Sequence, residues 1–118
     1  MGFKEDVQDL QNKVFAGQLM EAFEHYYAED VVMEDVGQPP RVGKAASRKH
    51  EENFLANIEA WHGGGINHIA FDESHKVAMI ESWMELTFKG QDAPVKMSQV
   101  AVQEWSEGKV VKERFYHP

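Results

Sequence analysis

An aspartate on an apolar strand face is the residue with the clearest chemical potential in this sequence. Asp35 lies in a short strand-like run, and because side chains of a strand alternate between faces, it shares a face with Val31 and Met33. A carboxyl group on such a face loses hydration, which disfavours its charged form and suits it to proton transfer near neutral pH. The sequence therefore predicts Asp35 as a general acid or base. The alternative is an aspartate that accepts turn N–H groups before Gly37 and Pro39.

A histidine on the following helical segment is the first candidate partner. His50 shares a predicted helical stripe with Ser47 and Phe54, and within hydrogen-bond reach of Asp35 it would form an acid–base pair. Otherwise it is a core or rim histidine. The segment begins like a zinc-protease helix, but Phe54 stands where the second histidine ligand would be, and the chain has no cysteine. We therefore expect no metal and no cofactor.

Polar residues on the later strands offer further candidates. Gln99 and Gln103 alternate with apolar residues and so share one face. Amides on an inward face must be hydrogen-bonded, which in a pocket means orienting a polar ligand group; the alternative is the solvated face of an antiparallel sheet. Glu113 and His117 raise the same two possibilities, and His117 could also belong to a loose C-terminal end.

Length, charge and hydropathy limit the classes of function. The 118 residues suit one domain, residues 1–118, with its own core. A formal net charge of −8 without a basic stripe disfavours nucleic acid as a partner. The N-terminal residues carry acids where a secretory signal would be apolar, and no run is long enough to span a membrane. We expect a cytoplasmic protein.

Hydrophobic periodicity and turn residues predict helices first and strands afterwards. Gly63–Gly65 is expected to end the third helix. The expected helices cover about 3–14, 19–27 and 43–62, and the expected strands 31–36, 66–71, 76–89, 95–105 and 109–117. Short links make the later strands antiparallel neighbours, which predicts an α+β domain with helices on one face of a curved sheet.

The predicted strand 76–89 carries large apolar side chains on both faces. Val77, Met79 and Trp83 fall on one face, and Ile80 and Leu86 fall on the other. A single layer of helices covers only one of these faces. The remaining face is therefore predicted to form a homodimer interface.

Several strings, at matching separations, resemble the SnoaL-like branch of the NTF2-like superfamily. They are Ala16–Phe23, Ala28–Val36, Pro40–Gly43 and Gly108–Tyr116. The resemblance implies a cone, in which a curved antiparallel or mixed sheet wraps around a long helix with two further N-terminal helices. It also implies an apolar pocket that opens at one end of the cone.

The resemblance to ketosteroid isomerases within this superfamily assigns roles to individual positions. Asp35 falls on the aspartate that acts as the proton-shuttling base. The tyrosine of the oxyanion hole falls on Leu10, and the second, protonated aspartate falls on Ala101, so both donors are missing. His50 falls on a pocket-facing aromatic residue.

The same comparison indicates which side chains would contact a ligand. They are Met97, Gln99, Gln103, Trp105, Glu113, Phe115 and His117, and the stripe of the predicted helix 43–62 adds Phe54 and Trp61 as candidates. The sequence thus predicts binding of a small, largely apolar metabolite with a carbonyl or hydroxyl group, with proton transfer by Asp35 as in isomerases and cyclases. A noncatalytic ligand-binding or dimerisation domain is the first alternative. A dehydratase that uses Asp35 with a histidine is the second.

Overall fold

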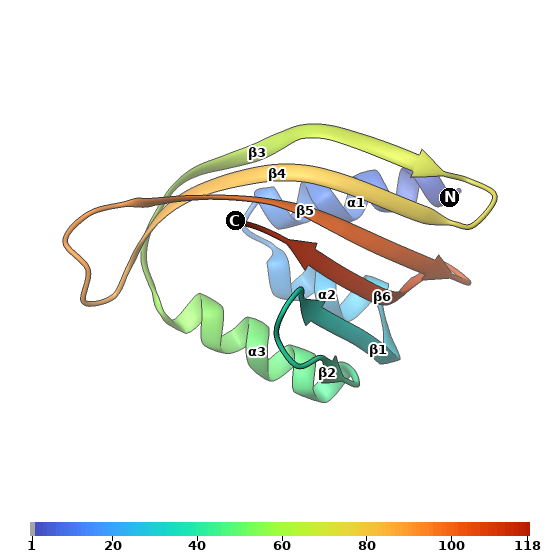
Figure 1. Cartoon of the computed structure of the whole chain (residues 1–118), viewed down its shortest axis with the longest axis horizontal. Coiled ribbons are helices and arrows are strands. Elements are labelled where there is room, and N and C mark those ends of the chain that lie inside the picture. Colours follow the sequence, from blue (N-terminus) through green and yellow to red (C-terminus); the bar gives the residue numbers. More distant parts are fainter. Residues whose placement is uncertain (1) are drawn as a thin grey trace.

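The computed structural model describes residues 2–118 as three helices and one sheet, as expected for an α+β fold. The elements in chain order are α1 (Phe3–Phe15), α2 (Leu19–Tyr26), β1 (Tyr27–Asp35), β2 (Arg41–Val42), α3 (Lys44–Ala56), β3 (Ile58–Asp72), β4 (Val77–Phe88), β5 (Val95–Ser106) and β6 (Lys109–Tyr116). The strands β3, β4 and β5 arch over α1, while α3 lies beside β1 and β2 (Figure 1).

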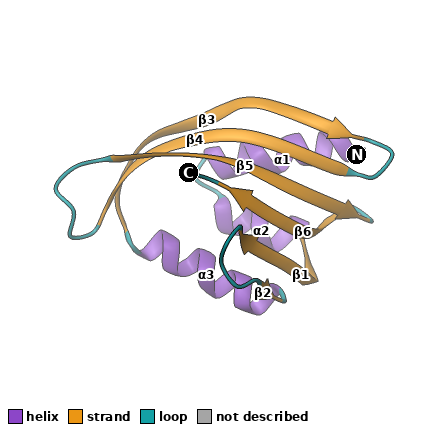
Figure 2. Cartoon of the chain, in the orientation of Figure 1, coloured by secondary structure: helices purple, strands orange, loops and turns teal. Residues whose placement is uncertain are grey.

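The sheet is mixed, with the strand order β2-β1-β6-β5-β4-β3. All neighbours are antiparallel except β1 and β6, which pair in parallel with Asp35 opposite Phe115. Figure 2 shows that the connection between β4 and β5 projects away from the helices, whereas the other strand connections stay close to the sheet. The parallel pair brings the end of β1 next to the C-terminal residues.

Apolar residues of α1 and α2 pack on the inner face of the sheet and form the core. Val7, Leu10 and Phe23 from the helices are at most 1% exposed, as are Val31 and Ile80 from the strands. The three-residue and four-residue steps of apolar positions in α1 and α2 fit one helical face, and the alternation in β1 and β4 fits one face of a sheet. Burial of these faces therefore holds the helices against the sheet.

The third helix is shorter than the sequence predicts, and the prediction that glycines end it is wrong. α3 ends at Ala56, and Gly63–Gly65 lie inside β3. At Gly64 a Cβ atom would come within 2.9 Å of the Trp61 ring and 3.0 Å of the Trp83 carbonyl oxygen. The strand needs glycine here because neighbouring atoms approach the backbone closely.

A two-residue strand that the sequence analysis missed also matters for the site. β2 pairs with β1 so that Arg41 lies opposite Met33. Gly43, at a φ of 92°, is the N-cap residue before α3 and has a conformation that favours glycine.

Candidate functional site

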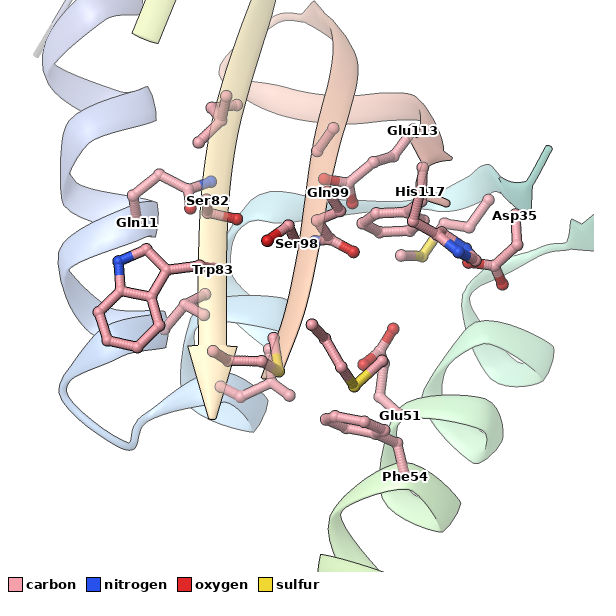
Figure 3. A pocket seen from close by; sticks show the side chains of 18 of the residues that line it. Gln11, Asp35, Glu51, Phe54, Ser82, Trp83, Ser98, Gln99, Glu113 and His117 are labelled. Carbon is pink, nitrogen blue, oxygen red and sulfur yellow. The ribbon is translucent and has the colours of Figure 1, made fainter. Parts of the chain in front are cut away.

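A cavity of about 420 Å³ lies between the inner face of the sheet and the three helices. Its size is within the range of small-molecule pockets. The apolar part of its wall includes Leu10, Val14, Leu19, Phe23, Met33, Phe54, Ile80, Trp83, Met84, Met97, Ala101 and Phe115. Polar side chains, including three carboxyl groups from different elements, interrupt this wall (Figure 3).

Asp35 lines the cavity on the strand face that the sequence predicts, but it is not surrounded by apolar groups alone. Its Oδ2 lies 3.0 Å from Nη1 of Arg41, and its Oδ1 lies 3.2 Å from Nε2 of His117. Pairing of β2 with β1 places Arg41, and the parallel β1–β6 register places His117 two residues beyond the partner of Asp35. Asp35 therefore faces the cavity as one member of an ion pair.

The expected pairing of Asp35 with His50 is wrong in geometry. The cavity-facing residues of α3 are Glu51 and Phe54, whereas His50 is exposed and does not line the cavity. Buried Lys44 and Ser47 show that the inner face of α3 continues to Glu51 at the usual helical spacing. The histidine that approaches Asp35 comes from the C-terminal end instead.

Glu113 is the most deeply buried carboxyl group of the site, at 3% exposure. It accepts hydrogen bonds from the Tyr27 hydroxyl and from Gln103 Nε2, the latter at 2.7 Å, and Trp105 Nε1 donates to Gln103 Oε1 at 3.0 Å. Burial raises the pKa of Glu113 to about 7, although the hydrogen bonds from Tyr27 and Gln103 oppose this rise. The four side chains form one buried polar chain.

This polar chain changes the roles of two predicted ligand contacts. Gln103 is fully buried and Trp105 is 5% exposed, and neither lines the cavity. Gln103 connects Glu113 to Trp105, so its amide is satisfied inside the protein without a ligand. The expectation that both residues face a ligand is therefore wrong.

Glu51 is a carboxyl group that the sequence analysis did not single out. It projects from α3 into the cavity (Figure 3). Burial raises the pKa of Glu51 to about 7, helped by the negative charges of Glu113 and Asp35 and opposed by Arg41. Ser47, Glu51 and Phe54 are four and three residues apart, which fits one helical face, and this spacing could have identified Glu51. The sequence analysis instead placed its neighbour His50 on that face.

The remaining predicted ligand residues divide between the cavity and the surface. Phe54, Met97, Gln99, Phe115 and His117 line the cavity together with Glu113. Trp61 does not line it and is 46% exposed. Gln11 and Ser82, which the sequence analysis did not identify, add polar groups to the wall.

The site's donor set does not suit a metal ion. Within residues 2–118 there is no group of three or more histidine, cysteine, aspartate or glutamate side chains placed to hold a metal ion. The same residues contain no helix that is long and apolar enough to cross a membrane. The cavity wall itself presents carboxyl, amide, hydroxyl and imidazole groups, which can form hydrogen bonds and transfer protons.

Solved structures with the same fold include proteins of several activities. A candidate SnoaL-like polyketide cyclase from Mesorhizobium loti is 24% identical and superposes with a TM-score of 0.85, covering 98% of this chain and 99% of its own. The epoxide hydrolase/cyclase-like enzyme SalBIII, with a role in pyran ring formation in the polyether salinomycin, is 24% identical with a TM-score of 0.82, covering 98% and 90%.

A third structure carries a bound small molecule. A hypothetical protein with a ketosteroid isomerase-like fold from Catenulispora acidiphila, in complex with trimethylamine, is 17% identical with a TM-score of 0.77, covering 95% of this chain and 84% of its own. At these identities the superpositions establish the fold alone. A comparison with curated protein sequences finds no match. The profile of the SnoaL-like domain matches residues 7–113, and the chain therefore belongs to the SnoaL-like domain family.

Proposed function

We propose that this protein catalyses proton transfer on a small, largely apolar metabolite that carries a carbonyl or hydroxyl group. The observation that carries the proposal is the carboxyl group of Asp35 at the wall of a largely apolar cavity of about 420 Å³. Apolar walls bind the body of the metabolite, and a few polar groups fix its orientation. The folds of a candidate cyclase and of an epoxide hydrolase/cyclase-like enzyme are compatible with such chemistry.

Asp35 is the proposed base. Its ion pair with Arg41 and its contact with His117 hold the carboxylate at the cavity wall in one orientation. From there it takes a proton from the carbon next to a carbonyl group and returns the proton to another carbon. Proton transfer by one positioned side chain contributes roughly 10²–10⁴-fold to a rate.

Charge that develops on the substrate oxygen needs a donor. The two positions that carry oxyanion donors in ketosteroid isomerases are occupied by Leu10 and Ala101, which line the cavity as apolar groups. Gln99 on β5 lies opposite Ser82 on β4, and both line the cavity. Their amide and hydroxyl groups can orient a substrate oxygen by hydrogen bonding.

Two other functions have specific support. A dehydratase would use the contact between Asp35 and His117, with one group removing a proton and the other protonating the leaving hydroxyl. A binding protein without turnover would use the same apolar wall, with Asp35 held in its ion pair as a structural group. Turnover by the wild-type protein separates the catalytic functions from binding.

The proposed assembly is a homodimer through the outer face of the sheet. Met79 on β4 is 46% exposed, and its strand neighbours Ala70 and Val102 face the same side. Burial of this face between two copies would remove apolar surface from water. Sedimentation velocity on wild type and Met79→Glu tests it: a wild type that stays monomeric at high micromolar concentration contradicts the dimer.

The catalytic proposal is tested by replacing Asp35 with asparagine. Small cyclic ketones such as cyclohexanone, 1-tetralone and 2-tetralone are incubated in deuterium oxide, and exchange of the hydrogens next to the carbonyl is followed by NMR. We expect Asp35→Asn to lower the protein-dependent exchange rate about 10²-fold or more. Asp92→Asn, at an exposed position between β4 and β5, is the matched control. Unchanged exchange in Asp35→Asn would remove Asp35 as the base.

A further inference from the structure

The three cavity carboxyl groups differ in what their oxygens contact. Asp35 has Arg41 and His117, and Glu113 has Tyr27 and Gln103. Within the described residues 2–118, the carboxyl group of Glu51 forms no hydrogen bond or ion pair with another side chain. Its oxygens are directed into the cavity from α3 (Figure 3). The hydrogen-bonding capacity of Glu51 is therefore free for a bound molecule.

We propose that Glu51 is the proton donor of the site, which protonates the substrate oxygen while Asp35 removes a proton from the adjacent carbon. This inference rests on the proposed function and adds a second catalytic residue to it. Glu51 supplies the donor that the apolar residues at the ketosteroid isomerase donor positions, Leu10 and Ala101, do not provide.

The surroundings of Glu51 favour its protonated form. Those of Asp35 differ, because Arg41 and His117 each place a nitrogen atom next to its carboxyl group. Phe54, three residues further along α3, lines the cavity beside Glu51 in Figure 3 and adds an apolar group to its surroundings. Because burial and the charges of Glu113 and Asp35 raise the pKa of Glu51 to about 7, a large fraction of Glu51 holds its proton at neutral pH. One cavity thus contains an ion-paired carboxylate and a carboxylic acid, a division that suits a base and an acid.

In this step Asp35 accepts one proton and Glu51 donates one proton. The Asp35 carboxylate takes the proton, and the electron pair of the broken C–H bond forms a carbon–carbon double bond. The π electrons of the carbonyl group move to its oxygen, which takes the proton from Glu51. The products are a neutral enol, a protonated Asp35 and a Glu51 carboxylate. When the substrate has a carbon–carbon double bond beside the deprotonated carbon, the enol is a conjugated dienol. Its hydroxyl returns a proton to Glu51 while Asp35 protonates the far carbon of the dienol, which restores both residues and moves the double bond.

Glu113 is less suited to this role although its pKa is raised to a similar value. Both of its oxygens already accept hydrogen bonds, from Tyr27 and from Gln103. Loss of a proton by Glu113 would create a charge at 3% exposure inside the protein. Its position indicates a structural connection between β1, β5 and β6.

The kinetic test compares Glu51→Gln with Glu52→Gln, its exposed neighbour on α3. Deuterium exchange into the ketones named above is measured from pH 5 to pH 9. We expect Glu51→Gln to lower the rate about 10²-fold and to abolish the fall in wild-type rate above pH 7, whereas Glu52→Gln keeps both. Thermal unfolding of each variant confirms that the fold is intact.

A binding test avoids dependence on turnover. 2-Naphthol presents an acidic hydroxyl in place of the enol oxygen, and its fluorescence reports binding. We expect Glu51→Leu, which removes the donor, to weaken naphthol binding about 10-fold, and Glu51→Gln, which keeps a donor, to stay within about 3-fold of wild type. Equal binding by all three proteins would overturn the proposal.

The two proposals fail in different ways. Exchange that survives in Asp35→Asn contradicts the proposed function itself. Exchange that is lost in Asp35→Asn but has wild-type rate and pH profile in Glu51→Gln contradicts the role of Glu51 alone. A wild-type protein that exchanges none of the ketones and binds no naphthol contradicts both.

Discussion

The inner face of the sheet is packed solid at one end and hollow at the other. At the packed end the Trp105 ring lies 5.7 Å from the Tyr26 ring and 6.2 Å from the Phe3 ring, both in edge-on contacts. At the hollow end Met97, on the same strand and the same face, is 39% exposed and lines the cavity. The strand β5 passes from the cavity into the core within a few residues.

The difference between the two ends shows that the inward face of a strand does not by itself identify a pocket residue. Gln99 lines the cavity, whereas Gln103, four residues later on the same face, is fully buried and bonded to Glu113 and Trp105. What decides the role is whether side chains of the helices fill the space over the position or leave it open. At the packed end α1 and α2 fill this space, where Phe3 of α1 and Tyr26 of α2 contact Trp105.

The largest expected effect compares truncation at the two ends. Trp105→Ala should lower the free energy of unfolding by about 3–5 kcal/mol, because it removes a core aromatic ring and leaves Gln103 Oε1 without its donor. Met97→Ala should lower it by less than about 1 kcal/mol, since its side chain borders empty space. Urea unfolding curves measure both changes. Equal losses would contradict the division into a packed and a hollow end.

The two glutamates with raised pKa values give the next comparison. Glu113→Ala leaves the Tyr27 hydroxyl and the Gln103 amide without their acceptor and should cost about 2–4 kcal/mol of folding stability at pH 5. Glu51→Ala breaks no such bond and should change stability by less than about 1 kcal/mol. Chemical denaturation at fixed pH measures the difference, and a loss in Glu51→Ala as large as in Glu113→Ala would show a structural role for Glu51.

The pH dependence of stability gives a third comparison, between the folded protein and the unfolded chain. Glu51 and Glu113 have pKa values raised from 4.5 to about 7, so the folded protein binds protons that the unfolded chain releases. Their contribution to stability is therefore greatest below about pH 4.5 and is lost as the pH rises to about 7. We expect the free energy of unfolding to fall over this window, and Glu113→Gln to flatten the curve. A wild-type curve that rises throughout the window would contradict these assignments.

Much of the fold followed from local sequence patterns, and much of the site did not. Periodicity and turn residues predicted the three helices and the late run of antiparallel strands, and alternation placed Asp35 on the cavity face. The residues around Asp35 depend on strand pairings that no local pattern reveals. Arg41 arrives through the two-residue β2 and His117 through the parallel β1–β6 pair.

Two further errors have specific physical causes. Several good helix formers and a glycine run suggested a long third helix, but the sheet uses Gly64 for close contact with Trp61 and the Trp83 backbone. His50 was preferred to Glu51 because neighbouring helical positions are separated by only part of a turn, and polar side chains next to an apolar stripe do not show which one turns inward. The bond from Tyr27 to Glu113 spans 86 residues and depends on the completed sheet.

The place of β6 between β1 and β5 has a consequence for how the protein acquires its shape. The meander of β3, β4 and β5 can assemble from neighbours in sequence, but β1 must wait for a strand synthesised long after it. Contacts between such distant segments slow folding, because the chain between them must first be closed into a loop. When β6 pairs with β1, Asp35 comes into contact with His117 and Tyr27 with Glu113. The site therefore forms in the same folding step that completes the sheet.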